Sequence, residues 1–303
     1  MGLAALGAAG LAWSVAEAHR YTLRRVEVPV LRAGQPAMRV LHVSDLHLTP
    51  RHRGRVEWVR SLDALDPDLV VVTGDFLGHL EAVPVVLEAL EPLLRRPGVF
   101  VLGSNDYYAP GMVKPWRYLT APSELDEQRP QLPWGDLVTG LTEAGWLDLS
   151  NAAGSLRVDG RSIDVRGVDD PHIERDRYDR VEGPFAADAD LALGVTHAPY
   201  LRILDAMAAD GAGLVLAGHT HGGQLCLPGY GALITNCDLD TGRAKGLSRH
   251  ARPWDGTGDH GLGGVDGRGA FLHVSAGLGT SPYAPVRFAC PPEATLLTLV
   301  PRA

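Results

Sequence analysis

The sequence predicts an α/β protein with two sheets, and three observations lead to this class. In the first half of the 303 residues, short apolar runs alternate with segments of helical periodicity. These runs are apolar throughout instead of alternating with polar residues, which is typical of parallel strands buried on both faces. In the second half, short strand-like runs are separated by turn residues with one helix among them, which indicates a second, mixed sheet.

The first half is expected to form a parallel βαβαβ unit. Its predicted strands are residues 37–44, 69–73 and 99–102. Its predicted helices are residues 56–65, ended by Pro67, and residues 82–94, ended before Pro97, because proline cannot continue a helix. A further helix over residues 136–144 is closed by Gly145.

The second half is expected to supply a mixed sheet and two long connections. The predicted strands are residues 156–158, 162–168, 191–195, 214–217, 271–275 and 295–299, with a helix at residues 200–209. Residues 107–135 are rich in proline and aromatic side chains, and residues 242–269 are rich in glycine with five basic residues. We expect both segments to be loops that cap a cleft, since loops of this length are usually functional.

Composition narrows the functional classes. A hydrophobic content of 45% and a charged content of 21% are ordinary for a folded domain, and the chain is long enough to bury a full core. The net charge of −8 argues against a general nucleic-acid-binding surface. Three cysteines without a CxxC pair argue against a zinc finger or a disulfide framework. A monomer without a nucleic-acid partner is expected.

The first 25 residues are expected to lie outside the main domain, which covers residues 26–303. Residues 2–16 carry no charge, and arginines follow at 20, 24 and 25. One interpretation is a short membrane anchor with the domain on the cytoplasmic face, by the positive-inside rule. The other is an export signal cleaved after the small-residue pattern Ala16-Glu17-Ala18. We favour membrane association and leave the side of the membrane open.

Five polar clusters each follow an apolar run directly, at the point where a strand is expected to end. They are Asp45-Leu46-His47, Gly74-Asp75, Gly103-Ser104-Asn105-Asp106, Thr196-His197 and Gly218-His219-Thr220-His221. Folding alone gives no reason for acid, amide and imidazole groups to recur at five consecutive strand ends. We interpret them as the ligands of two divalent metal ions.

The spacing within the clusters indicates how the metals would be held. Asp45 and His47 are two residues apart, so at a strand end both would face one ion. Asp75 has two carboxylate oxygens and can bridge two ions. The predicted ligands are Asp45, His47, Asp75, Asn105, His197, His219 and His221. Mixed carboxylate, amide and imidazole ligation favours Mn, Fe, Zn or Co over Mg or Ca.

Seven further histidines lack such a pairing and are expected to be ordinary buried or surface residues. They are His42, His52, His79, His172, His250, His260 and His273. Of these, His79 and His172 lie close enough in sequence to the clusters to line the same site.

This series of motifs resembles the calcineurin-like metallophosphoesterases over residues 40–300. The string Gly-His-Thr-His-Gly-Gly-Gln at 218–224, with Cys-Pro-Pro-Glu at 290–293, is similar to a bacterial membrane-associated subgroup of phosphodiesterases and lipid-precursor pyrophosphatases. The resemblance implies a four-layer αββα sandwich with a dimetal site where the two sheets meet. It implies Asp45, His47 and His221 on one metal, His197, His219 and an asparagine on the other, and Asp75 between them.

The third motif departs from the family pattern. The family has Gly-Asn-His-Asp or Gly-Asn-His-Glu, whereas this chain has Gly103-Ser104-Asn105-Asp106. Either Asn105 stands in place of the catalytic histidine, or the turn shifts so that Asn105 binds the metal; we favour the second. Asparagine can donate a hydrogen bond but cannot act as a general acid. Asp106, Tyr107 or water would then supply the proton, and Asn105 and Asp106 are the candidate catalytic residues.

The function expected from these features is metal-dependent phosphoester hydrolysis. Two divalent ions would clamp a phosphate and generate hydroxide from water near neutral pH for attack on phosphorus. The substrate would be a phosphodiester or pyrophosphate, lipid-linked or nucleotide-derived, reached at a membrane surface. The alternative is a catalytically impaired sensor or scaffold that binds metal and phosphate. A manganese-dependent assay on an activated phosphodiester separates the two.

Overall fold

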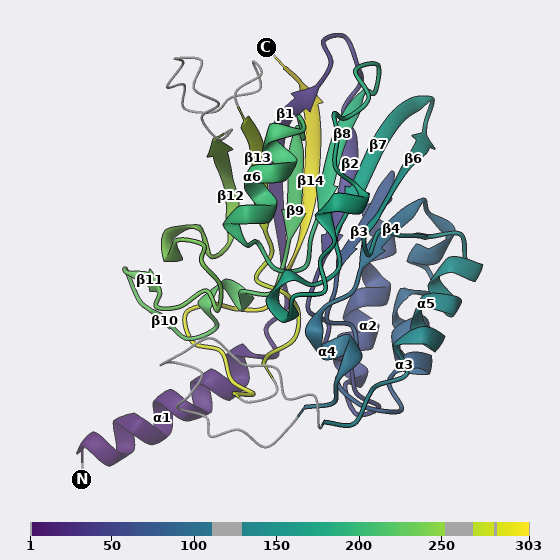
Figure 1. The fold of residues 1–303 in the computed structure, drawn as a ribbon. Coiled ribbons are helices and arrows are strands. Elements are labelled where there is room, and N and C mark those ends of the chain that lie inside the picture. The colour runs from purple at the N-terminus through teal and green to yellow at the C-terminus, as the bar shows by residue number, and fades with distance from the viewer. Residues whose placement is uncertain (1, 111–128, 252–268, 282–283, 303) are drawn as a thin grey trace.

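The computed structural model describes residues 2–110, 129–251, 269–281 and 284–302, and they form a four-layer sandwich. Two six-stranded mixed sheets pack face to face, and helices cover their outer faces (Figure 1). The αββα architecture expected from the sequence is therefore confirmed.

The first sheet joins strands from both ends of the chain. Its spatial order is β1 (Thr22–Leu31), β14 (Glu293–Pro301), β2 (Met38–Val43), β3 (Leu69–Thr73), β4 (Gly98–Val101) and β5 (Leu147–Asp148). The strands β2, β3 and β4 run parallel, as the apolar runs predicted. Strand β5, which was not predicted, is parallel to β4, and β14 pairs with β2 in the antiparallel direction.

The second sheet has a parallel centre and two antiparallel edges. Its order is β12 (Gly246–Ala251), β13 (Gly269–Val274), β9 (Leu214–Ala217), β8 (Leu191–Val195), β7 (Arg161–Gly167) and β6 (Ala152–Val158). The four central strands β13, β9, β8 and β7 run parallel, whereas β12 and β6 are antiparallel to their neighbours. A separate hairpin pairs β10 (Cys226–Leu227) with β11 (Gly231–Ala232).

The helices divide between the two outer faces and the N-terminal segment. The α-helices are α1 (Gly2–Glu17), α2 (Arg53–Ser61), α3 (Val83–Leu90), α4 (Ser104–Tyr107), α5 (Trp134–Glu143) and α6 (Leu201–Ala209). The 3₁₀ helices are η1 (Leu62–Leu65), η2 (Leu93–Arg95), η4 (Pro171–Ile173), η5 (Tyr178–Arg180), η6 (His221–Gly223) and η7 (Thr241–Arg243). No helix in the described part of the chain has the length and apolar character needed to cross a membrane.

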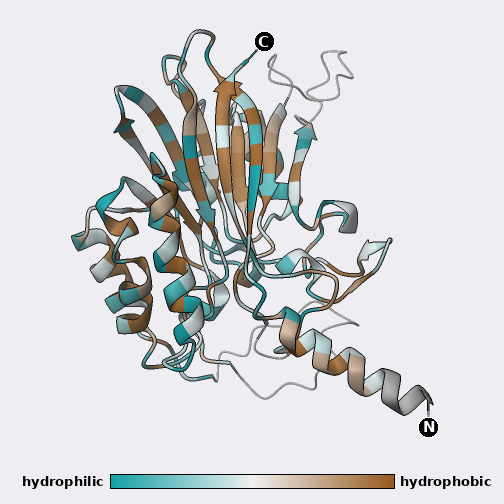
Figure 2. Ribbon diagram, turned by 180° about the vertical axis from the view of Figure 1, so that it is seen from behind, coloured by the Kyte–Doolittle hydropathy of each residue, from teal (hydrophilic) through white to brown (hydrophobic). Residues whose placement is uncertain are grey.

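Three apolar layers hold the sandwich together. One lies between the first sheet and helices α2, α3 and α5, one between the two sheets, and one between the second sheet and α6. Brown is concentrated in the central part of the sheets in the hydropathy view, because central strands such as β3 and β9 are fully buried (Figure 2). Each fully buried Val or Leu side chain contributes about 1.5–3 kcal/mol of transfer free energy.

The polar clusters all lie at one end of the sandwich. The parallel strands β2, β3 and β4 of one sheet and β8, β9 and β13 of the other point their carboxyl ends toward the lower edge in Figure 1. The connections that leave these strands therefore converge at the seam between the sheets. This convergence brings together side chains that are distant in sequence, such as His47 and His221, which are 174 residues apart.

The N-terminal segment is integrated with the domain more closely than the sequence predicted. Strand β1 begins at Thr22, so the expected boundary between residues 25 and 26 falls inside a strand of the first sheet. Upstream of it, the Glu17 carboxylate is buried and accepts hydrogen bonds from the backbone N–H groups of Ala289 and Cys290. The backbone carbonyl of Ser14 accepts one from Arg287. The end of α1 is thus part of the fold.

The two predicted loops are only partly described. Residues 111–128 and 252–268 lie outside the described residues, so the prediction that these two segments cap a cleft stays a prediction. Residues 246–251 were predicted to belong to the basic loop, and this is wrong: they form β12, the edge strand paired with β13. Its burial pattern lacks the continuous apolar run of a central strand, because one face of an edge strand stays exposed.

Candidate metal centre

The predicted ligands lie on tight turns just beyond the strand ends. Strands β2, β3 and β9 end at Val43, Thr73 and Ala217, and the chain then turns instead of staying extended. Five of the predicted ligands have left-handed backbone, with positive φ at Asp45, His47, Asp75, His219 and His221. The expectation that Asp45 and His47 share one face of an extended strand is therefore wrong, although the turn still brings them together. Left-handed backbone costs non-glycine residues about 1–3 kcal/mol each and concentrates at functional sites.

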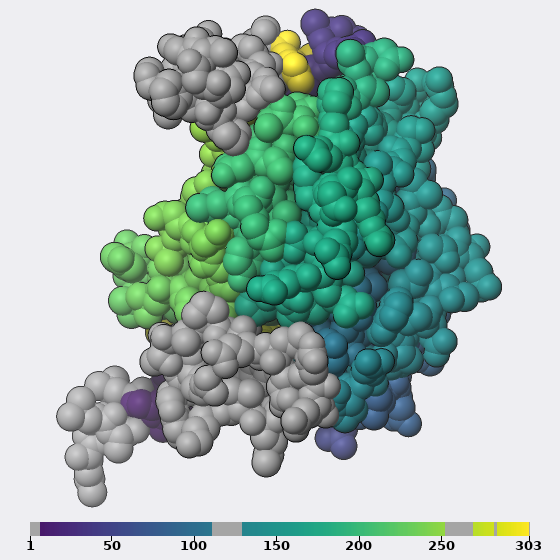
Figure 3. Space-filling view, in the orientation of Figure 1, coloured from purple at the N-terminus to yellow at the C-terminus, as the bar shows by residue number. Residues whose placement is uncertain are grey.

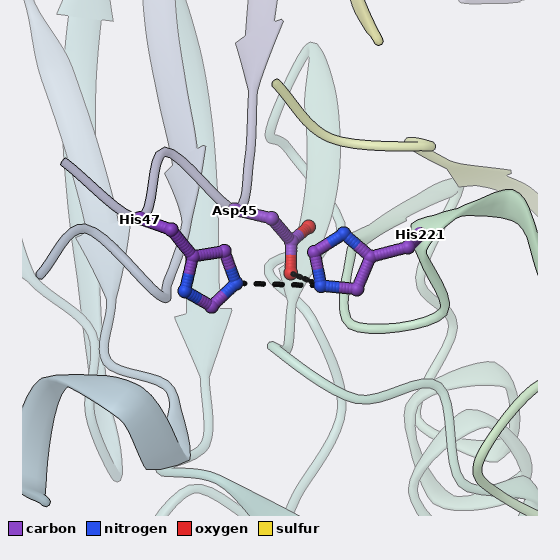
Figure 4. A group of neighbouring side chains, drawn as sticks. All are labelled: Asp45, His47 and His221. Atoms are coloured by element: carbon purple, nitrogen blue, oxygen red, sulfur yellow. Dashed lines mark hydrogen bonds and ion pairs between the residues drawn. The ribbon is translucent and has the colours of Figure 1, made fainter. Parts of the chain in front are cut away.

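One group of side chains comprises Asp45, His47 and His221. Their ligand atoms all lie within 4.8 Å of one another, and all three side chains are buried. The Nε2 atoms of His47 and His221 are 3.3 Å apart, and His221 Nε2 is 3.8 Å from Asp45 Oδ1 (Figure 4). The three side chains point toward a common centre, which is the arrangement of ligands around one ion.

A second group comprises Asp45, Asp75 and His197. Their ligand atoms also lie within 4.8 Å of one another. His197 Nε2 is 3.5 Å from Asp75 Oδ2, and His47 Nε2 of the first group is 3.4 Å from the same oxygen. Asp45 belongs to both groups and Asp75 contacts both, so the two groups are adjacent and share carboxylates. This is the donor arrangement expected for two neighbouring ions.

Asn105 and Asp106 both act on the Asp75 turn, but in different ways. The Asn105 side chain donates from Nδ2 to Asp75 Oδ2 at 2.8 Å, and its backbone N–H donates to Oδ1 at 2.8 Å. Asp106 is fully buried, and its two oxygens accept from the N–H groups of Asp75, Phe76, Leu77 and Gly103. Asp106 is therefore placed as a positioning residue of the turn, not as a proton donor to a substrate.

His219 lies beside the centre and outside both groups. Its Nε2 is 3.1 Å from the backbone carbonyl oxygen of Asn236, and its ring meets the His197 ring edge-on at 5.2 Å. The His172 ring lies against the His219 ring at 4.5 Å between centroids, tilted by 48°, so it does line the region. His79 is half exposed and points toward Glu81 at 4.0 Å.

Buried carboxylates dominate the electrostatics. Burial raises the pKa of Asp45 to about 6, with repulsion from Asp75 adding to the rise. Burial alone would lower the pKa of His197, but Asp75, Asp170 and Asp45 raise it to about 10. The cluster therefore holds a proton on His197 as its compensating charge. Burial lowers the pKa of His47 to about 4 and that of His221 well below its usual value, so both imidazoles are neutral donors of a lone pair.

The residues fit a pair of divalent cations. His197 Nε2 and His47 Nδ1 are buried ring nitrogens without a hydrogen-bond partner in the described part of the chain, and His197 Nε2 faces the Asp75 carboxylate. Buried polar atoms are normally paired, so an unpaired nitrogen aimed at a carboxylate marks a ligand position. Two carboxylates with neutral imidazoles form a donor set suited to transition-metal ions.

Sequence reasoning missed two buried charges near the centre. Asp170 is fully buried, and burial together with nearby carboxylates raises its pKa to about 7. Arg287 is fully buried and donates to the backbone carbonyls of His221, Gly277 and Gly279. Arg287 thereby ties the His221 turn to the C-terminal segment. Its position in a Pro-rich, otherwise apolar stretch was the only signal in the sequence.

Tyr107, which the sequence suggested as a proton donor, is engaged elsewhere. Its hydroxyl donates to both oxygens of Asp169, at 2.8 and 2.9 Å, and the guanidinium of Arg175 lies 4.0 Å over its ring. Burial and the Asp169 carboxylate raise the pKa of Tyr107. Its proton is therefore held by Asp169 and not presented to the centre.

Comparisons with known proteins point to one family. A family model described as calcineurin-like phosphoesterase matches residues 38–223. An uncharacterized metallophosphoesterase from Aquifex aeolicus is 26% identical over 296 residues, which cover 92% of this chain and 90% of the relative. A transmembrane protein with a metallophosphoesterase domain from Bos taurus is 26% identical over 229 residues, which cover 70% of this chain and 47% of that protein.

Solved structures show weaker likeness. A 5'-nucleotidase precursor from Thermus thermophilus aligns at 14% identity with a TM-score of 0.44. The alignment covers 87% of this chain and 55% of that chain, so this chain spans about half of its length.

Proposed function

Because the chain belongs to the calcineurin-like phosphoesterase family, we propose that it is a metal-dependent hydrolase that cleaves a phosphodiester or pyrophosphate bond at a membrane surface. The observation that carries the metal dependence is the pair of ligand groups joined at Asp45. Two bound divalent ions would neutralise charge on the phosphate and lower the pKa of water. The mixed donor set favours Mn, Fe, Zn or Co, and Mn²⁺ is the ion chosen for the test.

The residues of this chain prepare the site in three ways. Asp45, His47 and His221 would hold one ion, and Asp75 with His197 would hold the other beside Asp45. Asn105 donates two hydrogen bonds to the Asp75 carboxylate, one from its backbone N–H and one from its side-chain amide, and so orients this ligand. Asp106 fixes the backbone of the Asp75 turn. Neither Asn105 nor Asp106 offers a free proton to a leaving group.

Asn105, Asp106 and Tyr107, the described residues considered as proton donors, offer no free proton, and this favours a particular class of bond. The Asn105 amide donates to Asp75 and cannot act as a general acid, and Asp106 and Tyr107 have their oxygens committed to other partners. A positioned general acid is worth about 10²–10⁴-fold in rate when the leaving group needs protonation. A phosphoanhydride or an activated diester needs it least, since its leaving group is already stable as an anion. We therefore favour such bonds over alkyl phosphate monoesters.

The test is hydrolysis after metal removal and resupply. The chelated protein is assayed with Mn²⁺ on bis-p-nitrophenyl phosphate, on p-nitrophenyl phosphate and on a series of aryl phosphodiesters of rising leaving-group pKa. We expect Mn-dependent turnover that falls steeply along the series. Asp75→Asn should abolish it, whereas Asp205→Asn, at a half-exposed carboxylate paired with His250, should leave it unchanged.

A gain-of-function variant sharpens the same test. Asn105→His places an imidazole beside the Asp75 carboxylate. It should raise the rates of the poorest leaving groups most, by about 10-fold or more, so that the rate depends less steeply on leaving-group pKa. Tight binding of Mn²⁺ without turnover above the Asp75→Asn background would instead support the alternative, a protein that binds metal and phosphate as a sensor or scaffold.

The membrane part of the proposal is supported by the apolar surface of the N-terminal helix. Leu11, Trp13 and Val15 on α1 are each about half exposed. The helix extends away from the sandwich at the end where the ligand turns converge, and it is coloured largely in pale and brown tones (Figure 2). A lipid-linked or nucleotide-derived substrate presented at a bilayer would then approach from the side of the metal centre.

A further inference from the structure

A chain of hydrogen bonds leads from the middle of the sandwich to the Asp45 carboxylate. Ser44 Oγ lies 2.5 Å from Asp45 Oδ2, and Thr73 Oγ1 lies 2.7 Å from Ser44 Oγ. His42 Nε2 lies 3.0 Å from Thr73 Oγ1, and the Nδ1 atoms of His42 and His273 are 2.9 Å apart. All five residues are buried, with at most 1% of any of them exposed.

The chain crosses between the two sheets through a repeated sequence. The tetrapeptide Leu-His-Val-Ser occurs at residues 41–44, on β2, and again at residues 272–275, on β13. On each strand, the histidine continues the row that packs between the sheets, after Val40 on β2 and after Phe271 on β13. The apolar layer between the sheets therefore ends in a polar pair just before the metal centre.

The direction of each hydrogen bond follows from the carboxylate at the end of the chain. The ionised Asp45 carboxylate can only accept, so Ser44 donates its single hydroxyl proton to it. Ser44 Oγ must then accept from Thr73, and Thr73 Oγ1 must accept from His42 Nε2–H. A neutral His42 that carries its proton on Nε2 has a lone pair on Nδ1, which accepts from His273 Nδ1–H.

We propose that Ser44, Thr73, His42 and His273 form a one-way hydrogen-bond chain that positions the Asp45 carboxylate for metal binding. Donation to Oδ2 leaves Oδ1 directed toward His221, the partner in the first ligand group. Because Asp45 belongs to both ligand groups, its orientation affects both ions. Burial lowers the pKa of both histidines, which keeps them in the neutral forms that the chain requires.

A matched pair of threonine variants tests the chain through metal affinity. Thr73→Val keeps the shape of the side chain and removes the link, whereas Thr73→Ser retains the hydroxyl. The control is Thr295→Val: Thr295 is fully buried in the neighbouring strand opposite His42, and its hydroxyl has no hydrogen-bond partner among the described residues. Each metal-free, full-length variant is titrated with Mn²⁺ by calorimetry.

The expected result is a loss of Mn²⁺ affinity of about 10–100-fold in Thr73→Val, the usual cost of losing a partner of a metal ligand. Thr73→Ser and Thr295→Val should stay within about threefold of the natural protein. Equal affinities for Thr73→Val and the natural protein would overturn the proposal, as would an equal loss in Thr295→Val.

A second measurement tests the direction of the chain without metal or turnover. Long-range ¹⁵N–¹H NMR of the metal-free protein should find the proton of His42 on Nε2 and that of His273 on Nδ1. The opposite tautomer at His42 would overturn the proposal. This inference rests on the metal centre of the proposed function, but the two proposals fail in different experiments. A natural protein that binds no Mn²⁺ would overturn the metal centre. Wrong tautomers would overturn the hydrogen-bond chain alone.

Discussion

At the scale of single residues, the centre is a cluster of buried acids whose charge needs compensation. In the metal-free protein this compensation comes from the proton on His197, whose pKa the surrounding carboxylates raise to about 10. Burial would raise the pKa of Asp75, yet His197, His47 and the hydrogen bonds from Asn105 bring it below its ordinary value. Asp75 is thus ionised and His197 protonated, and a divalent ion must displace that proton to use Nε2 as a ligand.

Metal binding should therefore release about one proton from His197 at pH 7–9. The apparent affinity for Mn²⁺ should weaken by about tenfold per pH unit as pH falls through this range, because the raised pKa keeps the competing proton bound. Calorimetric titrations in two buffers of different ionisation enthalpy measure the proton count. His197→Gln, which carries no proton there, should bind more weakly but without this slope. Identical heats in both buffers for the natural protein would contradict the prediction.

The ligand residues themselves were largely predictable, whereas the residues that hold them were not. Asp45, Asp75 and His197 each follow an apolar run, and this pattern is visible in one sequence. Asp170 and Arg287 carry no such signal, since their importance depends on burial that only the assembled sheets create. The family resemblance groups His221 with Asp45 and His47, as the structure does, but no local pattern indicates that His219 turns toward Asn236.

At the scale of elements, the strand ends approach the centre so closely that glycine is required. A Cβ atom at Gly218 would lie 1.9 Å from Ser44 Oγ and 2.7 Å from Asp45 Oδ2. At Gly103 it would lie 2.3 Å from Asp75 Oδ1. These two glycines therefore make room for carboxylates at other strand ends, Asp45 after β2 and Asp75 after β3.

Gly218→Ala should push Ser44 and Asp45 out of place and lower Mn²⁺ affinity by at least about tenfold. Gly54→Ala in α2 is the control, because a Cβ there meets nothing within 4 Å. That substitution should leave affinity unchanged and stabilise the helix by roughly 0.5–1 kcal/mol. Thermal unfolding and Mn²⁺ titration of both variants check the prediction, and unchanged affinity in Gly218→Ala would show that the turn relaxes freely.

Elements were predictable where burial leaves a continuous apolar run. Strands β3, β8 and β9 have the bounds that the sequence predicted, and α6 differs from its prediction by one residue. Strands β1 and β12 were not predicted. Their outer faces carry polar residues, such as Arg24 and Arg249, and their sequences show no clear alternation of apolar and polar residues. Their pairing depends on partners elsewhere in the chain, which local patterns do not report.

At the scale of the whole molecule, apolar surface gathers on two neighbouring projections. The first is α1, with Leu11 and Val15 exposed one turn apart, and the second is the loop around the β10–β11 hairpin, with Leu227, Tyr230 and Leu233 exposed. The hairpin region forms a green projection at the left edge of the molecule (Figure 3). In Figure 1 both projections lie on the same side of the sandwich.

We expect this apolar surface to hold the protein on a bilayer. The full chain should co-sediment with vesicles of phosphatidylcholine and phosphatidylglycerol, and Leu11→Glu combined with Val15→Glu should reduce the bound fraction several-fold, because a charge in the acyl boundary is costly. Thr139→Glu, at an exposed position on α5, is the matched control for added charge. Equal sedimentation of all three proteins would rule out α1 as the contact.

The pairing of β1 with β14 has a consequence for how the protein is made. Residues 22–31 align in parallel with residues 293–301. Strand β1 therefore cannot pair with its partner until one of the last segments of the chain has been synthesised. Until then β2, which precedes the Asp45 turn, lacks its antiparallel neighbour β14. Contacts of such long sequence separation slow folding, and exposed strand edges promote aggregation. Completion of this sheet is therefore a late event after synthesis, and we expect C-terminal truncations within β14 to yield insoluble chains even though every predicted ligand lies upstream.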